Sequence, residues 1–214
     1  VEDKTVILHG FFLSSAAWRA RIALHLKGVV YKQRNYQLRA GEQRSEAYLT
    51  LNPQGLVPAL EIDGLVLTQS LAICEYLDET RGEVSIIGDT PAGKARARML
   101  ADIIACDVHP VQNLKILKKL KAMGHDRTQT DAWACDVIAE GLDAFDAMLA
   151  GDDSRYCCGE LPTIADIFLI PQMANARRYG VNVNWPKLIK IESNCFDLPA
   201  FHETTPDKQP DFQG

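Results

Sequence analysis

The chain has 214 residues, of which 47% are hydrophobic and 24% charged, a composition typical of an ordinary globular protein and not of a disordered or fibrous one. Its formal net charge of -5 and its pI near 5.5 argue against a general nucleic-acid binder, because phosphate binding needs a concentrated basic surface. No apolar run is long enough to span a bilayer and no secretion signal precedes the first one, so we expect a soluble cytoplasmic protein without a membrane partner.

The first 30 residues predict a strand followed by a helix. Residues 5–8 form a short apolar run that is typical of a buried strand. Ser14 and Ser15 are good N-cap residues, and apolar residues then recur at a spacing of four until Gly28. The segment is therefore predicted to be a strand-to-helix turn with both serines at the start of the helix.

The chain continues with short elements to about residue 80. We predict a strand over 31–36, a short helix over 44–51, a turn over 52–55 and a hairpin of strands 59–62 and 65–67. Asp63 and Gly64 form the hairpin turn, since this pair is a strong hairpin signal. Ser70 is predicted to cap the helix that follows. The order is βαβ, a connection, then ββα.

The second half of the chain shows helical periods only. A polar stretch with glycine and proline separates it from the first half and indicates a domain boundary. Helices are predicted over 94–120, 130–150, 163–179 and 185–194. Thr163 and Asp166 form a variant of the capping box at the start of the third of these helices. The predicted division is an α/β domain over 1–82, a linker over 83–92 and an all-helical domain over 93–214.

The spacing of the six cysteines in the sequence does not indicate a redox pair, a zinc site or a disulfide. The chain has no CxxC pair and no cysteine and histidine spacing that would build a zinc site. Cys157 and Cys158 are adjacent, and a disulfide between neighbours would be strained. We therefore expect free thiols and no metal site.

Four segments, in order along the chain, resemble one known family. They are 14–24 (SSAAWRARIAL), 52–60 (NPQGLVPAL), 107–114 (DVHPVQNL) and 171–178 (PQMANARR), with the pair Gln69-Ser70 between the second and third. Together they resemble the zeta-class glutathione transferases, the group that includes maleylacetoacetate isomerase. The resemblance covers nearly the whole chain and implies the glutathione transferase fold, a thioredoxin-like N-terminal domain followed by an all-α domain.

The resemblance implies that glutathione is the cofactor and that Ser14 binds its sulfur. A thiol is mostly protonated near neutral pH, so an enzyme that uses glutathione must stabilise the thiolate with hydrogen-bond donors and positive potential. A serine hydroxyl at a helix N-terminus supplies both. Ser15 supports or replaces Ser14 in this role, and the alternative is that both serines only cap the helix.

The resemblance also implies contacts for the peptide part of glutathione. Val57-Pro58 is similar to the position where this fold carries a cis-proline, so Val57 binds the cysteinyl part through its main chain, like an added strand. Gln69 and Ser70 lie at a helix N-terminus, which favours the glutamyl carboxylate. Alone, these segments would also suit an ordinary trans proline and a simple helix cap.

The second half carries the remaining candidate residues. His109 and Asn113 lie on the first helix of the second domain, which in the family faces the glutathione cleft. His109 binds the peptide or polarises a substrate carbonyl, or is a structural histidine. Lys115 is a candidate for an anionic substrate, although its lysine-rich run also suits a solvated face. Arg178 matches an arginine that holds a substrate carboxylate in the isomerases; the alternative is a surface salt bridge.

Two positions depart from the family pattern. The arginine before the serine pair, which helps to bind diacids, is Leu13 here, and the cysteine two residues after the first serine is Ala16. One carboxylate contact is therefore missing. This loss affects the substrate more than the glutathione site.

The resemblance implies a glutathione-dependent cis-trans isomerase that acts by reversible thiolate addition. Its natural substrate is maleylacetoacetate, in tyrosine breakdown, or maleylpyruvate. The alternative is a transferase that conjugates or dehalogenates small electrophiles such as alpha-halo acids, which Leu13 modestly favours. A third possibility, a non-catalytic binding protein, would not need the serine, cis-proline and Gln-Ser positions together. A homodimer is also implied.

Overall fold

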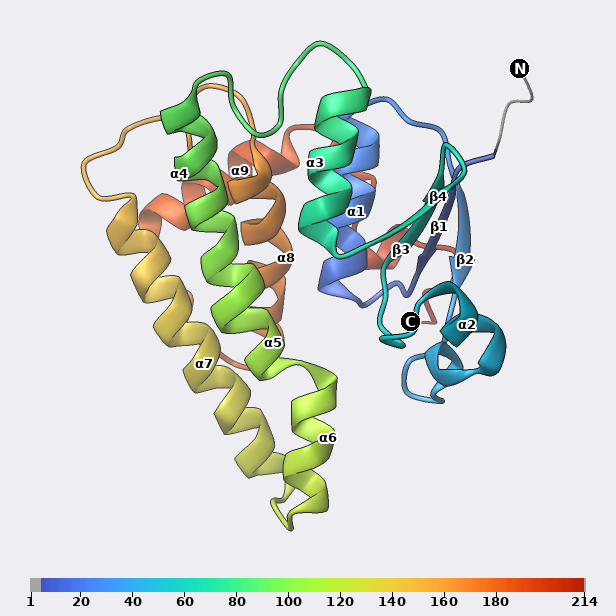
Figure 1. The fold of residues 1–214 in the computed structure, drawn as a ribbon. Coiled ribbons are helices and arrows are strands. Elements are labelled where there is room, and N and C mark those ends of the chain that lie inside the picture. Colours follow the sequence, from blue (N-terminus) through green and yellow to red (C-terminus); the bar gives the residue numbers. More distant parts are fainter. Residues whose placement is uncertain (1–4, 214) are drawn as a thin grey trace. The chain divides into compact units, whose positions relative to one another are not determined.

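The computed structural model describes residues 5–213, which form two compact units (Figure 1). One unit contains the chain up to Ile86 together with the segment from Asp197 onward. The other unit is Ile87–Phe196. The boundary between the units therefore falls inside the predicted linker over 83–92.

The first unit is an α/β domain, as predicted. In chain order its elements are β1 (Ile7–Gly10), α1 (Ser15–Leu26), β2 (Lys32–Asn35), a 3-10 turn (Glu42–Arg44), α2 (Glu46–Leu51), β3 (Ala59–Ile62), β4 (Leu65–Thr68) and α3 (Ser70–Thr80). The C-terminal segment adds α10 (Pro199–His202) and a 3-10 turn (Pro206–Lys208).

The four strands form one mixed sheet in the order β2-β1-β3-β4. β1 pairs in parallel with β2 and antiparallel with β3, and β3 pairs antiparallel with β4. Successive residues of a strand point to opposite faces. His9 contacts the ring of Tyr48 on α2, whereas Gly10 lies against Ala17 of α1. The sheet therefore has α2 on one face and α1, which packs against α3, on the other.

The local turns of this unit follow the predicted pattern. Asp63 and Gly64 both have positive φ, 53° and 82°, as a two-residue hairpin turn requires. The Val57-Pro58 peptide bond is cis, as the resemblance implied. The prediction that Ser70 caps α3 was wrong. Gln69 occupies the N-cap position, and Ser70 is the first helical residue.

The C-terminal segment also differs from the prediction, which assigned all of 93–214 to the helical domain. The indole Nε1 of Trp18 donates to Thr204 Oγ1 at 3.0 Å, and Arg21 Nε donates to the Thr204 carbonyl at 3.1 Å. α10 packs against α1, which carries both donors. These long-range bonds hold the segment from Asp197 onward to the first unit.

The second unit is all-helical, as predicted. Its elements are α4 (Pro91–Asp102), a π-helical segment (Ile103–Val108), α5 (His109–Gln112), α6 (Leu114–Ala122), α7 (Arg127–Met148), α8 (Ile164–Arg178) and α9 (Pro186–Phe196). α4 packs against α8, and α8 packs against both α7 and α9 (Figure 1). α8 is buried along most of its length and forms the centre of this unit's core.

The continuous helix predicted over 94–120 is divided in the structure. A π-helical segment precedes His109 and Pro110, and the chain is extended at Asn113 (φ -66°, ψ 151°). Proline lacks the N–H that would continue the regular α-helical bonding. The apolar spacing continues across the break, and for this reason the periodicity alone indicated one helix.

α8 begins at the predicted capping residues. Asp166 is fully buried, and its carboxylate accepts hydrogen bonds from the main-chain N–H groups of Thr163 (2.8 Å) and Cys157 (2.9 Å). Burial raises the pKa of Asp166, whereas these donors lower it. Among residues 5–213, none of the helices combines the length and apolar character needed to cross a membrane.

Candidate functional site

Ser14 lies at the N-terminus of α1, at the end of the loop that follows β1. Its Oγ accepts a hydrogen bond from the main-chain N–H of Ala17 at 3.2 Å, so it is the N-cap of α1. A hydroxyl that accepts through its oxygen can still donate its own proton. Ser15 is the first residue of the helix and is buried. The serine pair therefore offers a hydroxyl donor at the positive end of a helix dipole.

The residues before Ser14 are apolar. Phe11 is buried in a cluster with Tyr48 and Val57, and Leu13 packs against this cluster. The side chain of Leu13 has no polar atom, so it offers neither a charge nor a hydrogen bond at this position. The surroundings of the serine loop in this unit are therefore apolar on the side of α2.

Val57 lies at a bend just before β3, on the N-terminal side of the cis peptide bond to Pro58. Among the described residues, no hydrogen bond is recorded for its main-chain N–H or carbonyl. The preceding carbonyl, of Leu56, accepts bonds from Tyr48 Oη and Asn52 Nδ2, both at 2.7 Å. Burial raises the pKa of Tyr48 to about 12, so the phenol stays a donor. The Val57 main chain is held in place with its polar groups available.

The N-terminus of α3 has no side-chain cap. Gln69 has a positive φ of 70°, and its Nε2 donates to Gln54 Oε1 at 2.9 Å instead of capping the helix. Ser70 Oγ accepts a 3.4 Å bond from Arg19 Nη1. Burial lowers the pKa of Arg19 to about 9, which leaves it protonated at neutral pH. An anion at this helix end would meet unpaired N–H groups, the helix dipole and a nearby cation.

Two hydrogen bonds connect the segments that carry these candidate residues within the first unit. Arg19 belongs to α1, which Ser14 caps, and it reaches Ser70 on α3. Gln54 belongs to the turn before Val57, and it bonds to Gln69. The structure thus brings together the serine loop, the turn before the cis-proline and the start of α3.

The second unit holds His109 and Asn113 at the break after the π-helical segment. Asn113 Nδ2 contacts His109 Nε2 at 3.1 Å, and Asn113 Oδ1 accepts from the main-chain N–H of Lys115 at 3.0 Å. Since the amide nitrogen can only donate, Nε2 of His109 is an acceptor in this arrangement. Lys115 is exposed on α6. The break thus presents an imidazole, an amide and a lysine close together in the chain.

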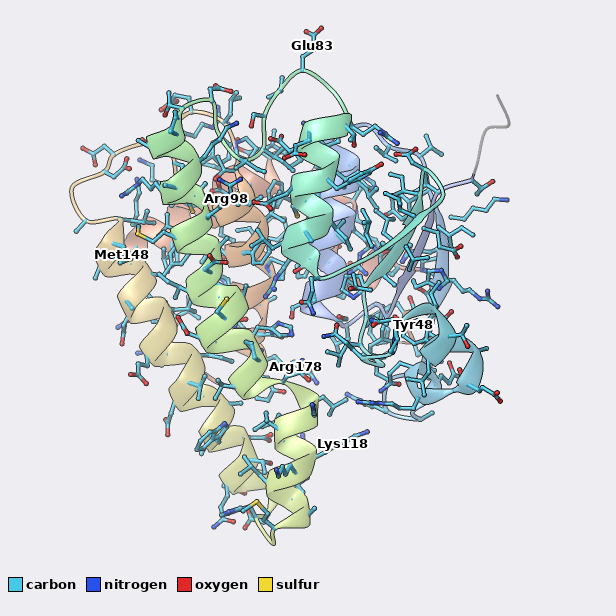
Figure 2. All side chains as sticks on the ribbon, in the orientation of Figure 1. Tyr48, Glu83, Arg98, Lys118, Met148 and Arg178 are labelled. Carbon is cyan, nitrogen blue, oxygen red and sulfur yellow. The ribbon has the colours of Figure 1, made fainter. Side chains whose placement is uncertain are left out.

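Arg178, which is labelled in Figure 2, lies in the last turn of α8. The residue before it, Arg177, has a different role. Arg177 makes a two-point ion pair with Glu192, with a 2.6 Å bond from Nη1 and a second bond from Nη2. Arg178 is exposed, and its guanidinium lies 5.4 Å from the ring centre of Tyr179. Within residues 5–213 no hydrogen bond or ion pair of Arg178 is recorded. Its guanidinium can therefore meet an external carboxylate.

Sequence reasoning missed three residues that support the first group. Arg19, Tyr48 and Asn52 are each buried, at 2% exposure, and each bonds to a candidate residue or to its neighbour. Arg19 and Asn52 lie inside segments that carried the family resemblance, and this resemblance was the signal that could have identified them. Tyr48 gave no signal, because an aromatic residue on a short helix is most simply a core residue.

Two family models match the chain. The N-terminal domain of glutathione S-transferase matches residues 4–79, and the C-terminal domain of glutathione S-transferase matches residues 95–190. Together these ranges cover most of both units.

Individual proteins are similar along almost the whole chain. Maleylacetoacetate isomerase of Pseudomonas aeruginosa is 38% identical over 208 residues, 95% of this chain and 97% of that protein. The holo structure of a zeta-class maleyl pyruvate isomerase is 40% identical with a TM-score of 0.94, over 97% of this chain and all of that one. A maleylacetoacetate isomerase of Methylobacterium extorquens, with bound malonate and glutathione, is 35% identical with a TM-score of 0.93, over the same shares.

Proposed function

The chain belongs to the glutathione S-transferase family, and from this premise we propose that it is a glutathione-dependent cis-trans isomerase of maleyl-type diacids. The substrate is maleylacetoacetate or maleylpyruvate. The observation that carries the proposal is the likeness, at 38% and 40% identity over nearly the full chain, to isomerases of these two compounds. Members of a family with this degree of likeness share the fold, and the site residues below support the activity.

The described residues fit glutathione at two places in the first unit. The uncapped N-terminus of α3, with Arg19 against Ser70, suits the glutamyl carboxylate. The main-chain N–H and carbonyl of Val57 suit the cysteinyl part, which would add to them like a short strand. Gln69 and Pro58 complete this arrangement by shaping the backbone at each place.

Ser14 is the residue that we assign to the sulfur, with Ser15 in support. Glutathione, when bound, supplies a thiolate that adds reversibly to the activated double bond and is released again, so it is not consumed. The hydroxyl of Ser14 donates to that sulfur and holds it in the charged state. The helix dipole of α1 acts in the same direction, because its positive end lies at Ser14.

The second unit supplies the groups that we assign to the substrate. Arg178 has a planar guanidinium that lies over the ring of Tyr179 and has no hydrogen-bond or ion-pair partner among the described residues, so it suits a carboxylate of the diacid. Lys115 offers a second cation on α6. His109 and Asn113, which bond to each other, offer polar groups for the peptide or for a substrate carbonyl.

The alternative activity, conjugation of glutathione to small electrophiles, has one observation in its favour. Leu13 packs against the apolar cluster beside the serine loop. The family pattern described above has an arginine at this position in the diacid isomerases. An apolar surface there would accept an uncharged electrophile more easily than a second carboxylate.

The two activities are separated by following glutathione. The purified protein is mixed with maleylacetoacetate or maleylpyruvate, with and without glutathione, and in parallel with a chloro-nitrobenzene and dichloroacetate. Isomerisation that requires glutathione but leaves its concentration constant supports the proposal. Conjugation without isomerisation would overturn it in favour of the transferase.

We also propose that the protein is a cytoplasmic homodimer. All six cysteines are free thiols in the structure, which suits a reducing compartment. The edge strand β4 exposes Leu65 and Val66, at 47% and 46%, and exposed apolar residues on an edge strand suit an interface. Light scattering on the eluting protein tests the dimer, and replacement of Val66 by glutamate should weaken it.

A further inference from the structure

Residues 11–14, which lead to Ser14 at the start of α1, form a tight turn. Inside this turn, the main-chain N–H and carbonyl of Phe12 both make hydrogen bonds to residues outside the turn. The main-chain N–H of Ser14 donates to the carbonyl of Phe11 at 3.0 Å, which closes the turn. Phe12, inside the turn, donates its N–H to Asp211 Oδ2 at 2.9 Å. Its carbonyl accepts from Arg21 Nη2 at 3.1 Å. Both peptide groups that flank Phe12 therefore have fixed partners from outside the loop.

The two partners, Arg21 and Asp211, lie close enough for their charges to interact, and Asp211 is half-buried. Arg21 is fully buried, and burial lowers its pKa to about 10, so it is still charged at neutral pH. Its Nε donates to the Thr204 carbonyl at 3.1 Å. Asp211 is the nearby acid, and its charge raises the pKa of Arg21. The pair thus combines a cation from α1 with an acid from the end of the chain.

The C-terminal segment contacts the same turn through an aromatic pair. The rings of Phe12 and Phe212 lie edge to face with their centres 5.7 Å apart. Phe212 is 43% exposed, so the pair lies at the surface of the unit. Asp211 therefore holds the main chain of Phe12, and Phe212 contacts its side chain.

We propose that Asp211 and Phe212 are positioning residues for Ser14, so that the C-terminal segment is part of the thiolate site. This inference rests on the proposed function. Because the peptide groups on both sides of Phe12 are fixed by hydrogen bonds, the backbone of Leu13 and Ser14 has little freedom to move. The hydroxyl of Ser14 is thereby aimed at one place, and misplacement of a reacting group by about 1 Å can cost a hundredfold in rate.

The test compares variants of the segment in the full-length protein. Asp211→Ala removes the acceptor for the Phe12 N–H, whereas Asp211→Asn keeps an oxygen that can accept this bond. Phe212→Ala removes the aromatic contact. Asp207→Ala is the matched control, because Asp207 is an acid of the same segment with no recorded side-chain bond among the described residues.

Three quantities are measured: kcat for isomerisation, KM for glutathione, and the pKa of bound glutathione from its thiolate absorbance. For Asp211→Ala we expect kcat to fall on the order of tenfold to a hundredfold and the thiol pKa to rise. KM for glutathione should stay within about twofold, since Val57 and the α3 N-terminus hold the peptide. Asp211→Asn should recover most of the activity, and Asp207→Ala should match the wild type.

Two results would overturn the inference. One is a folded Asp211→Ala protein with the wild-type kcat and thiol pKa. If that variant does not fold, an unchanged kcat in Phe212→Ala has the same effect. A wild-type protein that binds glutathione but does not isomerise maleyl compounds would overturn the proposed function instead, and the thiolate titration of the variants would still test the positioning of Ser14.

Discussion

The phenol of Tyr48 donates a 2.7 Å hydrogen bond to the main-chain carbonyl of Leu56, the residue before Val57. Asn52 Nδ2 donates to the same oxygen, also at 2.7 Å. Both side chains are almost completely buried, at 2% exposure. Two donors from α2 and its C-terminal cap thus fix the peptide that leads to the main-chain groups assigned to glutathione.

We expect Tyr48→Phe to weaken glutathione binding more than turnover. The change removes one of the two donors to Leu56 and should lower the free energy of unfolding by about 1 kcal/mol. KM for glutathione should rise severalfold with kcat nearly unchanged, because Val57 is assigned to the peptide part of glutathione and not to the reacting sulfur. Tyr36→Phe is the control, since Tyr36 packs on Tyr48 but bonds to His9. Equal KM values in all three proteins would contradict the assignment.

Ser14→Ala should have the opposite kinetic signature. It removes the hydroxyl that we assign to the thiolate, so kcat should fall by on the order of a hundredfold while KM for glutathione changes little. Loss of the N-cap bond to Ala17 should also lower the free energy of unfolding by about 1 kcal/mol. Ser15→Ala is the comparison. If Ser15→Ala loses turnover and Ser14→Ala does not, the roles of the two serines are exchanged.

Gly141→Ala should destabilise the second unit because the added methyl group would clash with the side chain of Val108. A Cβ on this α7 glycine would lie 2.1 Å from Cγ2 of Val108, in the π-helical segment that leads to His109. Overpacking of this kind costs about 1–3 kcal/mol in the free energy of unfolding. Denaturant unfolding of Gly141→Ala, Val108→Ala and the double variant measures the coupling between them. Additive losses would show that Val108 is not the residue that the added methyl group displaces.

Much of the first unit could be predicted because its signals are local. Asp63-Gly64 requires positive φ and makes the hairpin, and Ser14 lies directly before the apolar period of α1, which it caps. The group around Ser14, Val57 and Gln69 could be named from short segments of sequence. These features depend on residues close together in the chain.

The remaining features depend on three-dimensional contacts that the hydrophobic periodicity of the sequence does not indicate. Asn113 interrupts a helical pattern whose apolar spacing continues across it, and only Pro110 marked the region locally. The segment with Thr204 and Asp211 has no regular pattern, and it joins the first unit through bonds to residues far away in the chain, such as Trp18. Distant partners of this kind are set by packing, and the sequence of either segment alone does not indicate them.

The buried histidine of β1 predicts how stability depends on pH. His9 is 2% exposed, and its ring nitrogens bond to Tyr36 Oη at 2.9 Å and to Glu61 Oε1 at 2.7 Å. Burial lowers the pKa of His9 below its ordinary value of 6.5, although the hydrogen bond with Glu61 opposes this. As the pH falls below 6.5, the unfolded chain takes up a proton at His9 that the folded chain does not. The free energy of unfolding should therefore decrease.

This loss should begin near pH 6.5 and end once the pH is below the folded pKa of His9, with a slope of up to about 1.4 kcal/mol per pH unit between them. Urea unfolding of the wild type and His9→Gln between about pH 5 and 8 measures it, since glutamine keeps a donor for Glu61 but does not titrate there. Burial also lowers the pKa of His25, but that contribution is present in both proteins and cancels in the difference. Parallel curves for the two proteins would mean that His9 takes up its proton equally in both states, and the buried ring would then have to be charged against Glu61 in the folded protein.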